Sequence, residues 1–275
     1  MSVLDVFTKC NEAVVLGVPI ERTNRSDKEF HFQNWFVRTL KALHLNYDPP
    51  KRNTYPDFRL VASPMGFELK GLEFPGRWAD FDCNSQVCTG FHNGRSIYYV
   101  FGRYPKSKEN TYPVLDLVIC HGNFLNARHD YIHKNKSFRG FGSYGDILVR
   151  DRKMYVAPTP FGLLDGIDRQ VTLLLLAEEK VDDRFRFVGE VERVETQKMV
   201  TKYTFDLKTN ELATAEEDNS TAGTVHRFRA YRLKDAPPTE VKMKQEPELP
   251  TNEDADEAEA NIDRKAKGPR RKRHQ

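Results

Sequence analysis

The sequence predicts a mixed α/β (α+β) domain, in which a mixed β-sheet is flanked by helices, followed by a charged C-terminal tail. The chain contains 18 Phe, 11 Tyr and 2 Trp among 275 residues, and a chain of this size and composition can bury a substantial core. One segment with helical apolar spacing precedes a series of strand-like segments. The composition changes abruptly near residue 235, which marks the start of the tail.

The helix is expected over residues 27–45, with Ser26 or Asp27 as its N-cap. Pro49 and Pro50 follow it, and proline cannot continue a helix. The apolar residues at helical spacing are Phe32, Trp35 or Phe36, Leu40 and Leu43. This pattern predicts an amphipathic helix packed on a sheet.

Strands are expected where β-branched and aromatic residues gather between Gly, Pro and Asn. The segment 168–179 fits a buried strand or a short helix equally well, and 200–207 and 226–233 are expected to form a hairpin-like pair. The other expected strands are 57–62, 66–72, 96–104, 114–120, 146–156 and 185–194. A helix followed by such a run of strands is typical of a mixed sheet.

The predicted domain spans residues 1–234, and residues 235–275 form the predicted tail. This tail combines proline, an acidic block and a basic terminus with almost no aromatic residues. Such a composition cannot offset the entropy of ordering, so we expect it to be disordered. The terminal basic residues 270–273 are either a solvated charge run or an arm that contacts DNA phosphates.

The net charge of +3 neither supports nor excludes a nucleic-acid partner, because local patches matter more than the sum. No apolar run is long enough to span a bilayer, and the N-terminus does not resemble a signal peptide, so a cytoplasmic protein is expected. Four irregularly spaced cysteines do not form a disulfide framework. Cys83, Cys88 and His92 lack the close CxxC spacing of a zinc site.

The most informative stretch is YPDF at residues 55–58 followed by GFELKG at residues 66–71. Residues two apart in a strand face the same side, so Glu68 and Lys70 project together while Phe67 and Leu69 point into the core. If the two segments pair, Asp57 reaches the end of the Glu68 strand and two carboxylates converge. Two carboxylates suit Mg²⁺, which usually keeps several waters and binds substrate phosphate.

The alternative interpretation is that Asp57 caps a turn and that Glu68 and Lys70 are ordinary exposed residues of an edge strand. The string ExK alone has no predictive value. The nearby Pro-Asp pair, the apolar alternation around ExK and the aromatic helix before it together favour a functional site.

These motifs resemble the PD-(D/E)xK nuclease pattern as it occurs in type II restriction endonucleases. The resemblance covers residues 56–70, and it implies a restriction-endonuclease-like core, Asp57 and Glu68 as metal ligands, and Lys70 as the catalytic lysine. The resemblance also allows Glu29, on the preceding helix, to contact the metal site. The favoured interpretation of Glu29 is an acid in the first helical turn, where it complements the helix dipole.

Two polar segments are candidates for contacts to double-stranded DNA. The first resembles the loop that follows the lysine in such enzymes. The second mixes cations with aromatic residues, and it is either a basic loop laid along a duplex or a solvated connector. Their candidate DNA-binding residues are Arg77, Trp78, Asn84, Ser85, Gln86, Lys134, Lys136 and Arg139.

The sequence therefore favours a Mg²⁺-dependent type II restriction endonuclease. Two antiparallel DNA strands require two equivalent active sites, so a homodimer is expected. The resemblance also implies a cognate DNA methyltransferase that acts on the same sequence without binding this chain. The alternatives are a PD-(D/E)xK repair or recombination nuclease acting on structured DNA, and a non-catalytic DNA-binding module.

Overall fold

A computed structural model describes residues 2–22, 28–48, 54–75, 80–83, 87–127, 144, 147–150, 153–156, 159–206, 208–209 and 211–244. The helices are α1 (Val3–Val15), α2 (Lys28–Ala42) and α3 (Pro160–Leu163), with a 3-10 turn η1 (Gly122–Phe124). The strands are β1 (Ile20–Glu21), β2 (Tyr47–Asp48), β3 (Phe58–Leu60), β4 (Met65–Phe74), β5 (Phe81–Asp82), β6 (Phe91–His92), β7 (Arg95–Pro105), β8 (Thr111–Tyr112), β9 (Asp116–His121), β10 (Ile147–Arg150), β11 (Lys153–Val156), β12 (Leu164–Asp165), β13 (Val171–Leu176), β14 (Phe185–Val194), β15 (Lys198–Asp206), β16 (Glu211–Asp218), β17 (Val225–Leu233) and β18 (Lys242–Met243).

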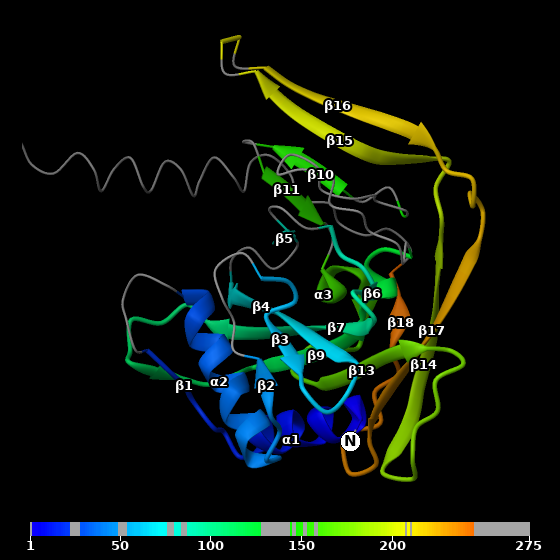
Figure 1. Ribbon diagram of the computed structural model, residues 1–275. Helices are drawn as coiled ribbons and strands as arrows, with labels where there is room; N and C mark the ends of the chain where they lie inside the picture. The colour runs from blue at the N-terminus through cyan, green and yellow to red at the C-terminus, as the bar shows by residue number, and fades with distance from the viewer. Residues whose placement is uncertain are drawn as a thin grey trace, which may run out of the picture.

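The centre of the molecule is a 9-stranded mixed sheet in the order β14-β17-β13-β9-β7-β4-β3-β2, with β6 paired to β7. Strand β4 runs parallel to β7, and β9 runs parallel to β13, while the remaining described pairs of this sheet are antiparallel. Helices α1 and α2 cover one face of the sheet (Figure 1). The fold is therefore a mixed α/β architecture with a predominantly β core. This confirms the mixed α/β class that the sequence predicts.

Each face of the sheet carries its own hydrophobic cluster, because side chains alternate along every strand. Phe67 and Leu69 of β4 pack with Trp35 and Phe36 of α2 on the helix face. Leu72 of β4 belongs to the second cluster, on the opposite face. Glu68 and Lys70 share the face of Leu72, so the sheet separates them from α1 and α2.

Several expected elements are confirmed, and one uncertain segment is decided. The helix expected over residues 27–45 is α2, and the strands expected around residues 66–72, 96–104 and 185–194 are β4, β7 and β14. The ambiguous segment 168–179 contains β13, whose side chains are almost completely buried between β9 and β17. Burial on both faces explains its uninterrupted apolar sequence.

Helix α1 was not expected from the sequence, although its start carries a recognisable signal. The Asp5 carboxylate accepts a hydrogen bond of 2.9 Å from the Ser2 backbone N–H, which is half of a capping box. Its apolar face, including Val6 and Phe7, is completely buried. The aspartate at the third helical position replaces the usual Glu or Gln, which makes the signal weaker in sequence.

The expected pairing of segments 200–207 and 226–233 is wrong. Strand β15 instead pairs with β16, a strand that was not predicted, and β17 pairs with β14 and β13. The segment 146–156 forms two strands, β10 and β11, rather than one. Local strand propensity identified most of these segments, but partner choice depends on contacts between distant residues.

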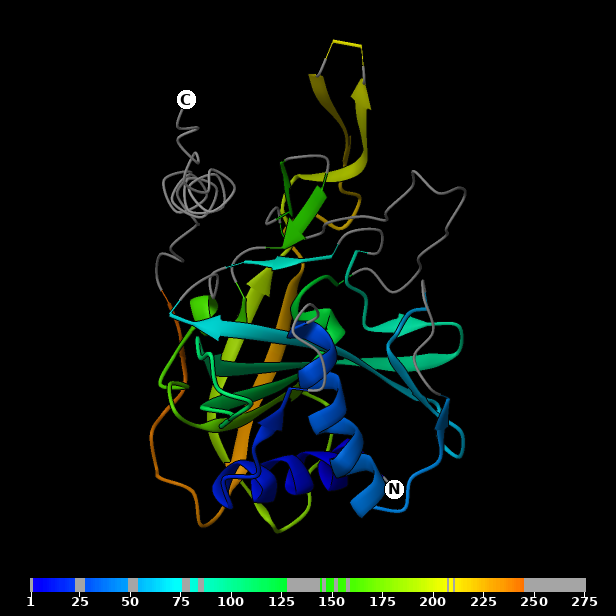
Figure 2. The same cartoon turned by 90° about the vertical axis from the view of Figure 1, so that its left-hand side faces the viewer.

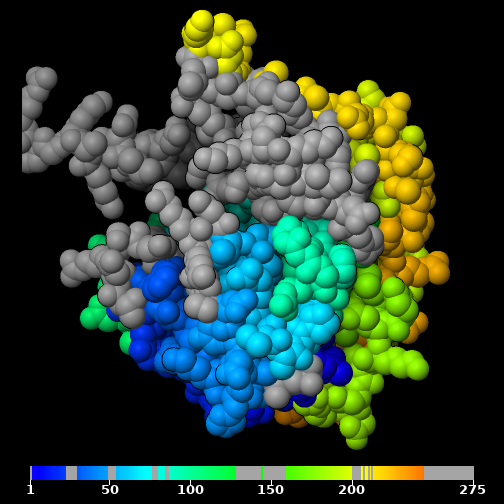
Figure 3. All heavy atoms as spheres, viewed as in Figure 1, coloured from blue at the N-terminus to red at the C-terminus, as the bar shows by residue number. Residues whose placement is uncertain are grey.

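Strands β14 to β17 form one long hairpin whose outer half, β15–β16, stands away from the sheet (Figures 1 and 2). Its inner strands form a flank of the molecule in the space-filling view (Figure 3). At the junction of the two halves the Glu195 carboxylate accepts hydrogen bonds from Asn219, Thr221 and His226. These contacts fix the point where the hairpin leaves the sheet.

Residues 235–244, which the predicted boundary assigns to the tail, pack against the domain. Strand β18 pairs with β12, and the Val241 N–H donates to the Val188 carbonyl at 2.8 Å. Val241 is only 1% exposed, and Arg232 donates to the Thr239 carbonyl at 2.9 Å. A single buried valine and backbone pairing anchor this stretch, and average composition does not reveal them.

Truncation after Lys234 is therefore expected to destabilise the domain. The loss of Val241 removes about 1.5–3 kcal/mol of hydrophobic burial, and the buried guanidinium of Arg232 loses one of its acceptors. Urea denaturation followed by circular dichroism measures the effect. A second truncation after Lys244 keeps these contacts and is the control; equal stability of the two truncations would contradict a stabilising role for residues 235–244.

Among the described residues, none of the helices is sufficiently long and apolar to cross a membrane.

Candidate functional site

The β3–β4 hairpin brings Asp57 beside Glu68. Phe58 of β3 is the register partner of Phe67 of β4, so Asp57, which directly precedes β3, lies next to Glu68. The Asp57 N–H donates to Glu68 Oε2 at 3.2 Å, and the Leu69 N–H donates to Asp57 Oδ2 at 2.9 Å. The Glu68 carboxylate thus holds the Asp57 backbone, the β4 backbone holds the Asp57 carboxylate, and the two acidic residues lie together at one end of the hairpin.

Lys70 completes this group on the same face of β4. Its Nζ lies 2.9 Å from Glu68 Oε1, and the side chains of Lys70 and Glu68 are 11% and 13% exposed. Strand β4 lies between β3 and β7 and is not an edge strand. The interpretation of Glu68 and Lys70 as exposed residues of an edge strand is therefore wrong.

Two tyrosines border the carboxylates on the same face. Tyr99 of β7 is the register partner of Glu68, and its hydroxyl lies 2.9 Å from that of Tyr55. Burial raises the pKa of both phenols well above the ordinary value, and the Glu68 charge raises both further. Both hydroxyls therefore stay protonated next to the site at neutral pH.

Buried thiols lie around this group. Burial raises the pKa of Cys83 and Cys120 well above the ordinary thiol value, and the nearby charge of Lys70 only partly opposes this at Cys83. The four cysteines are buried and form no disulfide. Their high pKa keeps Cys83 and Cys120 as neutral thiols at neutral pH, whereas a nucleophile requires a thiolate.

The described residues contain no cluster of three or more His, Cys, Asp or Glu side chains arranged to hold a metal ion. Magnesium, however, often binds through one or two carboxylates and keeps several waters. Asp57 and Glu68 supply two hard oxygen donors, and a carboxylate oxygen that accepts one hydrogen bond has a second lone pair. The donor set thus fits Mg²⁺ better than zinc, whose preferred ligands are thiolate and imidazole.

The remaining predicted site residues are not brought to this group by any described contact. Glu29 lies in the first turn of α2, and its side chain lies outside the described residues. The candidate DNA-binding residues also lie outside the described part of the chain: Arg77, Trp78, Asn84, Ser85, Gln86, Lys134, Lys136 and Arg139. Their proposed contacts with DNA stay predictions.

Tyr55 and Tyr99 were missed by reasoning from the sequence. Tyr55 stands two residues before Asp57 within the quoted motif, which was a usable signal for its proximity. Tyr99 lies in a run of apolar residues and is indistinguishable from a core tyrosine in sequence. Only the parallel pairing of β4 with β7 places it beside Glu68.

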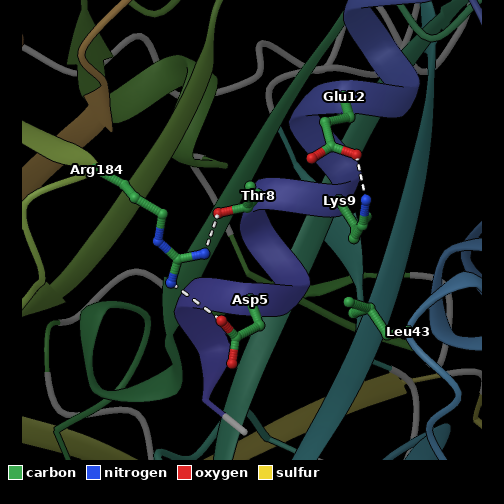
Figure 4. Close-up of a pocket in the computed structure, with 6 residues that line it drawn as sticks. All are labelled: Asp5, Thr8, Lys9, Glu12, Leu43 and Arg184. Atoms are coloured by element: carbon green, nitrogen blue, oxygen red, sulfur yellow. Dashed lines mark hydrogen bonds and ion pairs between the residues drawn. The ribbon is translucent and has the colours of Figure 1, made fainter.

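An open hollow elsewhere on the surface offers no comparable chemistry. It lies between α1 and the loop before β14, where Arg184 bonds Asp5 at 3.0 Å and Lys9 bonds Glu12 at 2.5 Å (Figure 4). Asp5, Lys9, Glu12 and Arg184 are all partly exposed and already paired. We interpret this cluster as surface ion pairing, which adds little to stability.

Comparisons of the chain with protein-family models, with curated proteins and with solved structures found no match.

Proposed function

We propose that this chain is a Mg²⁺-dependent DNA endonuclease of the PD-(D/E)xK type with a restriction-endonuclease-like core, acting as a type II restriction enzyme. The observation that carries the proposal is the convergence of Asp57, Glu68 and Lys70 at one end of the β3–β4 hairpin. A carboxylate and a lysine on the internal strand β4, with the Asp57 carboxylate beside them, match the chemistry of phosphodiester hydrolysis. The resemblance of residues 56–70 to the nuclease motif supports the same conclusion.

In this proposal Asp57 and Glu68 hold Mg²⁺, which when bound activates water and neutralises charge on the scissile phosphate. Lys70 orients the attacking water and offsets the negative charge that develops on the phosphate. Glu68 also keeps the Lys70 amine in place through their 2.9 Å contact. The proposed substrate is double-stranded DNA, cut by a homodimer with one site for each strand.

The proposal is tested by digestion of unmodified phage and plasmid DNA by the purified chain, with and without Mg²⁺, followed by sequencing of the ends. Discrete fragments with a common end sequence are the expected result. Cleavage confined to flaps, junctions or free ends would instead indicate a repair or recombination nuclease. Specific DNA binding without any cleavage would indicate a non-catalytic module. DNA methylated by the proposed cognate methyltransferase should resist cleavage at the same sequence.

The metal requirement gives a separate prediction. Mg²⁺ and Mn²⁺ are expected to support cleavage, whereas Ca²⁺ is expected to support DNA binding without turnover. Calcium prefers longer, more flexible coordination, which holds the complex but positions the reacting groups poorly. Gel-shift and cleavage assays on the same duplex, with each cation in turn, measure both steps; cleavage that persists undiminished in a chelator would contradict a metal mechanism.

A further inference from the structure

The backbone N–H of Asp57 donates to a side chain rather than to a strand carbonyl. Strand β3 begins only at Phe58, so the described ladder with β4 starts one residue after Asp57. The Asp57 N–H instead donates to the Glu68 side chain at 3.2 Å. The Asp57 carboxylate in turn accepts from the Leu69 N–H. A shift of the Asp57 backbone would therefore disturb both carboxylates at once.

Upstream of Asp57 this backbone is anchored first by Pro56, which is buried next to Gly66, and then by Tyr55. Its hydroxyl lies 2.9 Å from the Tyr99 hydroxyl, and the Thr89 backbone also hydrogen-bonds it. Its ring packs edge-on against His92, with the ring centroids 5.1 Å apart. Tyr99 is 1% exposed and belongs to β7, a central strand. The hydroxyl pair thus fastens the start of the motif to the rigid middle of the sheet.

We propose that Tyr55 and Tyr99 form a positioning pair that sets the geometry of the Asp57 and Glu68 carboxylates for a divalent cation. This inference rests on the proposed function, because it concerns the cation site of the same nuclease. Mg²⁺ requires near-ideal octahedral geometry at about 2.0–2.1 Å. A displacement of Asp57 by a fraction of an ångström therefore weakens cation binding, although neither tyrosine touches the cation.

The opposite face of the same strand provides a matched control. Tyr98 is adjacent to Tyr99, is also buried, and donates from its hydroxyl to Glu179 Oε1 at 2.9 Å. Its ring packs on the helix face, against Phe67. Tyr98→Phe thus removes a hydrogen bond of a buried phenol from the same strand and leaves the surroundings of Asp57 and Glu68 unchanged.

The experiment measures Mn²⁺ binding by electron paramagnetic resonance, and cleavage as a function of Mg²⁺ concentration, for the full chain and for Tyr55→Phe, Tyr99→Phe, the double variant and Tyr98→Phe. Changes in groups that orient metal ligands typically weaken metal affinity by about 10–100-fold. We expect Tyr55→Phe and Tyr99→Phe each to weaken Mn²⁺ binding within this range. For both variants, we also expect the Mg²⁺ concentration for half-maximal cleavage to rise by a larger factor than that by which the cleavage rate at saturating Mg²⁺ falls.

The double variant is expected to resemble Tyr55→Phe, because that variant already lacks the hydrogen bond that Tyr99→Phe removes. Tyr98→Phe should lower the melting temperature and leave Mn²⁺ binding unchanged. If Tyr99→Phe does not fold, Tyr55→Phe alone decides the question. If Tyr55→Phe weakens Mn²⁺ binding no more than Tyr98→Phe does, the two tyrosines are not a positioning pair, and the nuclease proposal is unaffected. Mn²⁺ binding is also measured for Asp57→Ala. If the unmodified chain binds no Mn²⁺, or binds it no better than Asp57→Ala does, the cation site is absent and both proposals fail.

Discussion

Asp57→Asn is expected to reduce DNA cleavage by at least about a thousandfold, which corresponds to about 4 kcal/mol of transition-state stabilisation. Asparagine keeps an oxygen that can accept from the Leu69 N–H but lacks the charge that holds the cation. In the proposed mechanism the metal site serves the transition state more than docking, so specific DNA binding should remain detectable. Lys70→Ala and Glu68→Ala are expected to behave similarly, and Glu29→Ala more mildly.

Single-turnover cleavage and duplex binding, measured in parallel at saturating Mg²⁺, test this prediction. Asp48→Asn is the control, because Asp48 lies on the neighbouring strand β2, is half-exposed, and pairs with Arg59 at 3.4 Å. It should cleave at the wild-type rate. Full cleavage by purified Asp57→Asn or Lys70→Ala would remove the basis of the nuclease assignment.

Asp116→Ala is expected to cost about 3–5 kcal/mol of unfolding free energy, because it leaves a buried guanidinium without its main partner. Arg103 Nε donates to Asp116 Oδ1 at 2.8 Å, and these two side chains are 7% and 1% exposed. Burial opposes the charge of Arg103, but hydrogen bonds and charges from Asp116 and Asp168 outweigh it and raise the pKa of Arg103. The cation therefore persists when Asp116 is removed, and it keeps only a pair with Asp168, whose side chain is 81% exposed.

Urea denaturation at neutral pH measures this loss. Glu192→Ala breaks the exposed pair with Arg227 between β14 and β17 and is expected to have no measurable effect. Replacement of both buried partners, Arg103→Met with Asp116→Leu, should recover much of the stability, since no charge is then left buried. A loss for Asp116→Ala no larger than that for Glu192→Ala would show that Arg103 finds another partner.

The candidate site could be predicted to a large extent because its three residues lie within one short hairpin. The two-residue period of a strand places Glu68 and Lys70 on one face. The short connection between β3 and β4 places Asp57 opposite Glu68. Local geometry of this kind depends on few residues. The alternative of an exposed edge strand could not be excluded from sequence, because the position of β4 within the sheet depends on β7, which lies far along the chain.

Most elements were also predictable from local patterns, but their partners were not. Segments 200–207 and 226–233 are close to β15 and β17 in extent, yet each pairs with a different strand from the one expected. The packing of residues 235–244 on the domain was missed for a related reason. Val241 packs into a core assembled from distant strands, and the surrounding polar sequence hides that contact.

By itself, the sequence predicted a mixed α/β core, a helix over residues 27–45 packed on a sheet, and the convergence of Asp57, Glu68 and Lys70 on the condition that their two segments pair. These features follow from side-chain periodicity and a short turn, which operate over a few residues. Only the tertiary structure decided that β4 is internal, that Tyr99 stands beside Glu68, and that Arg103 is buried against Asp116. Each of these depends on pairing between strands that are remote in sequence, where the stabilising free energy comes from burial and register that no local pattern specifies.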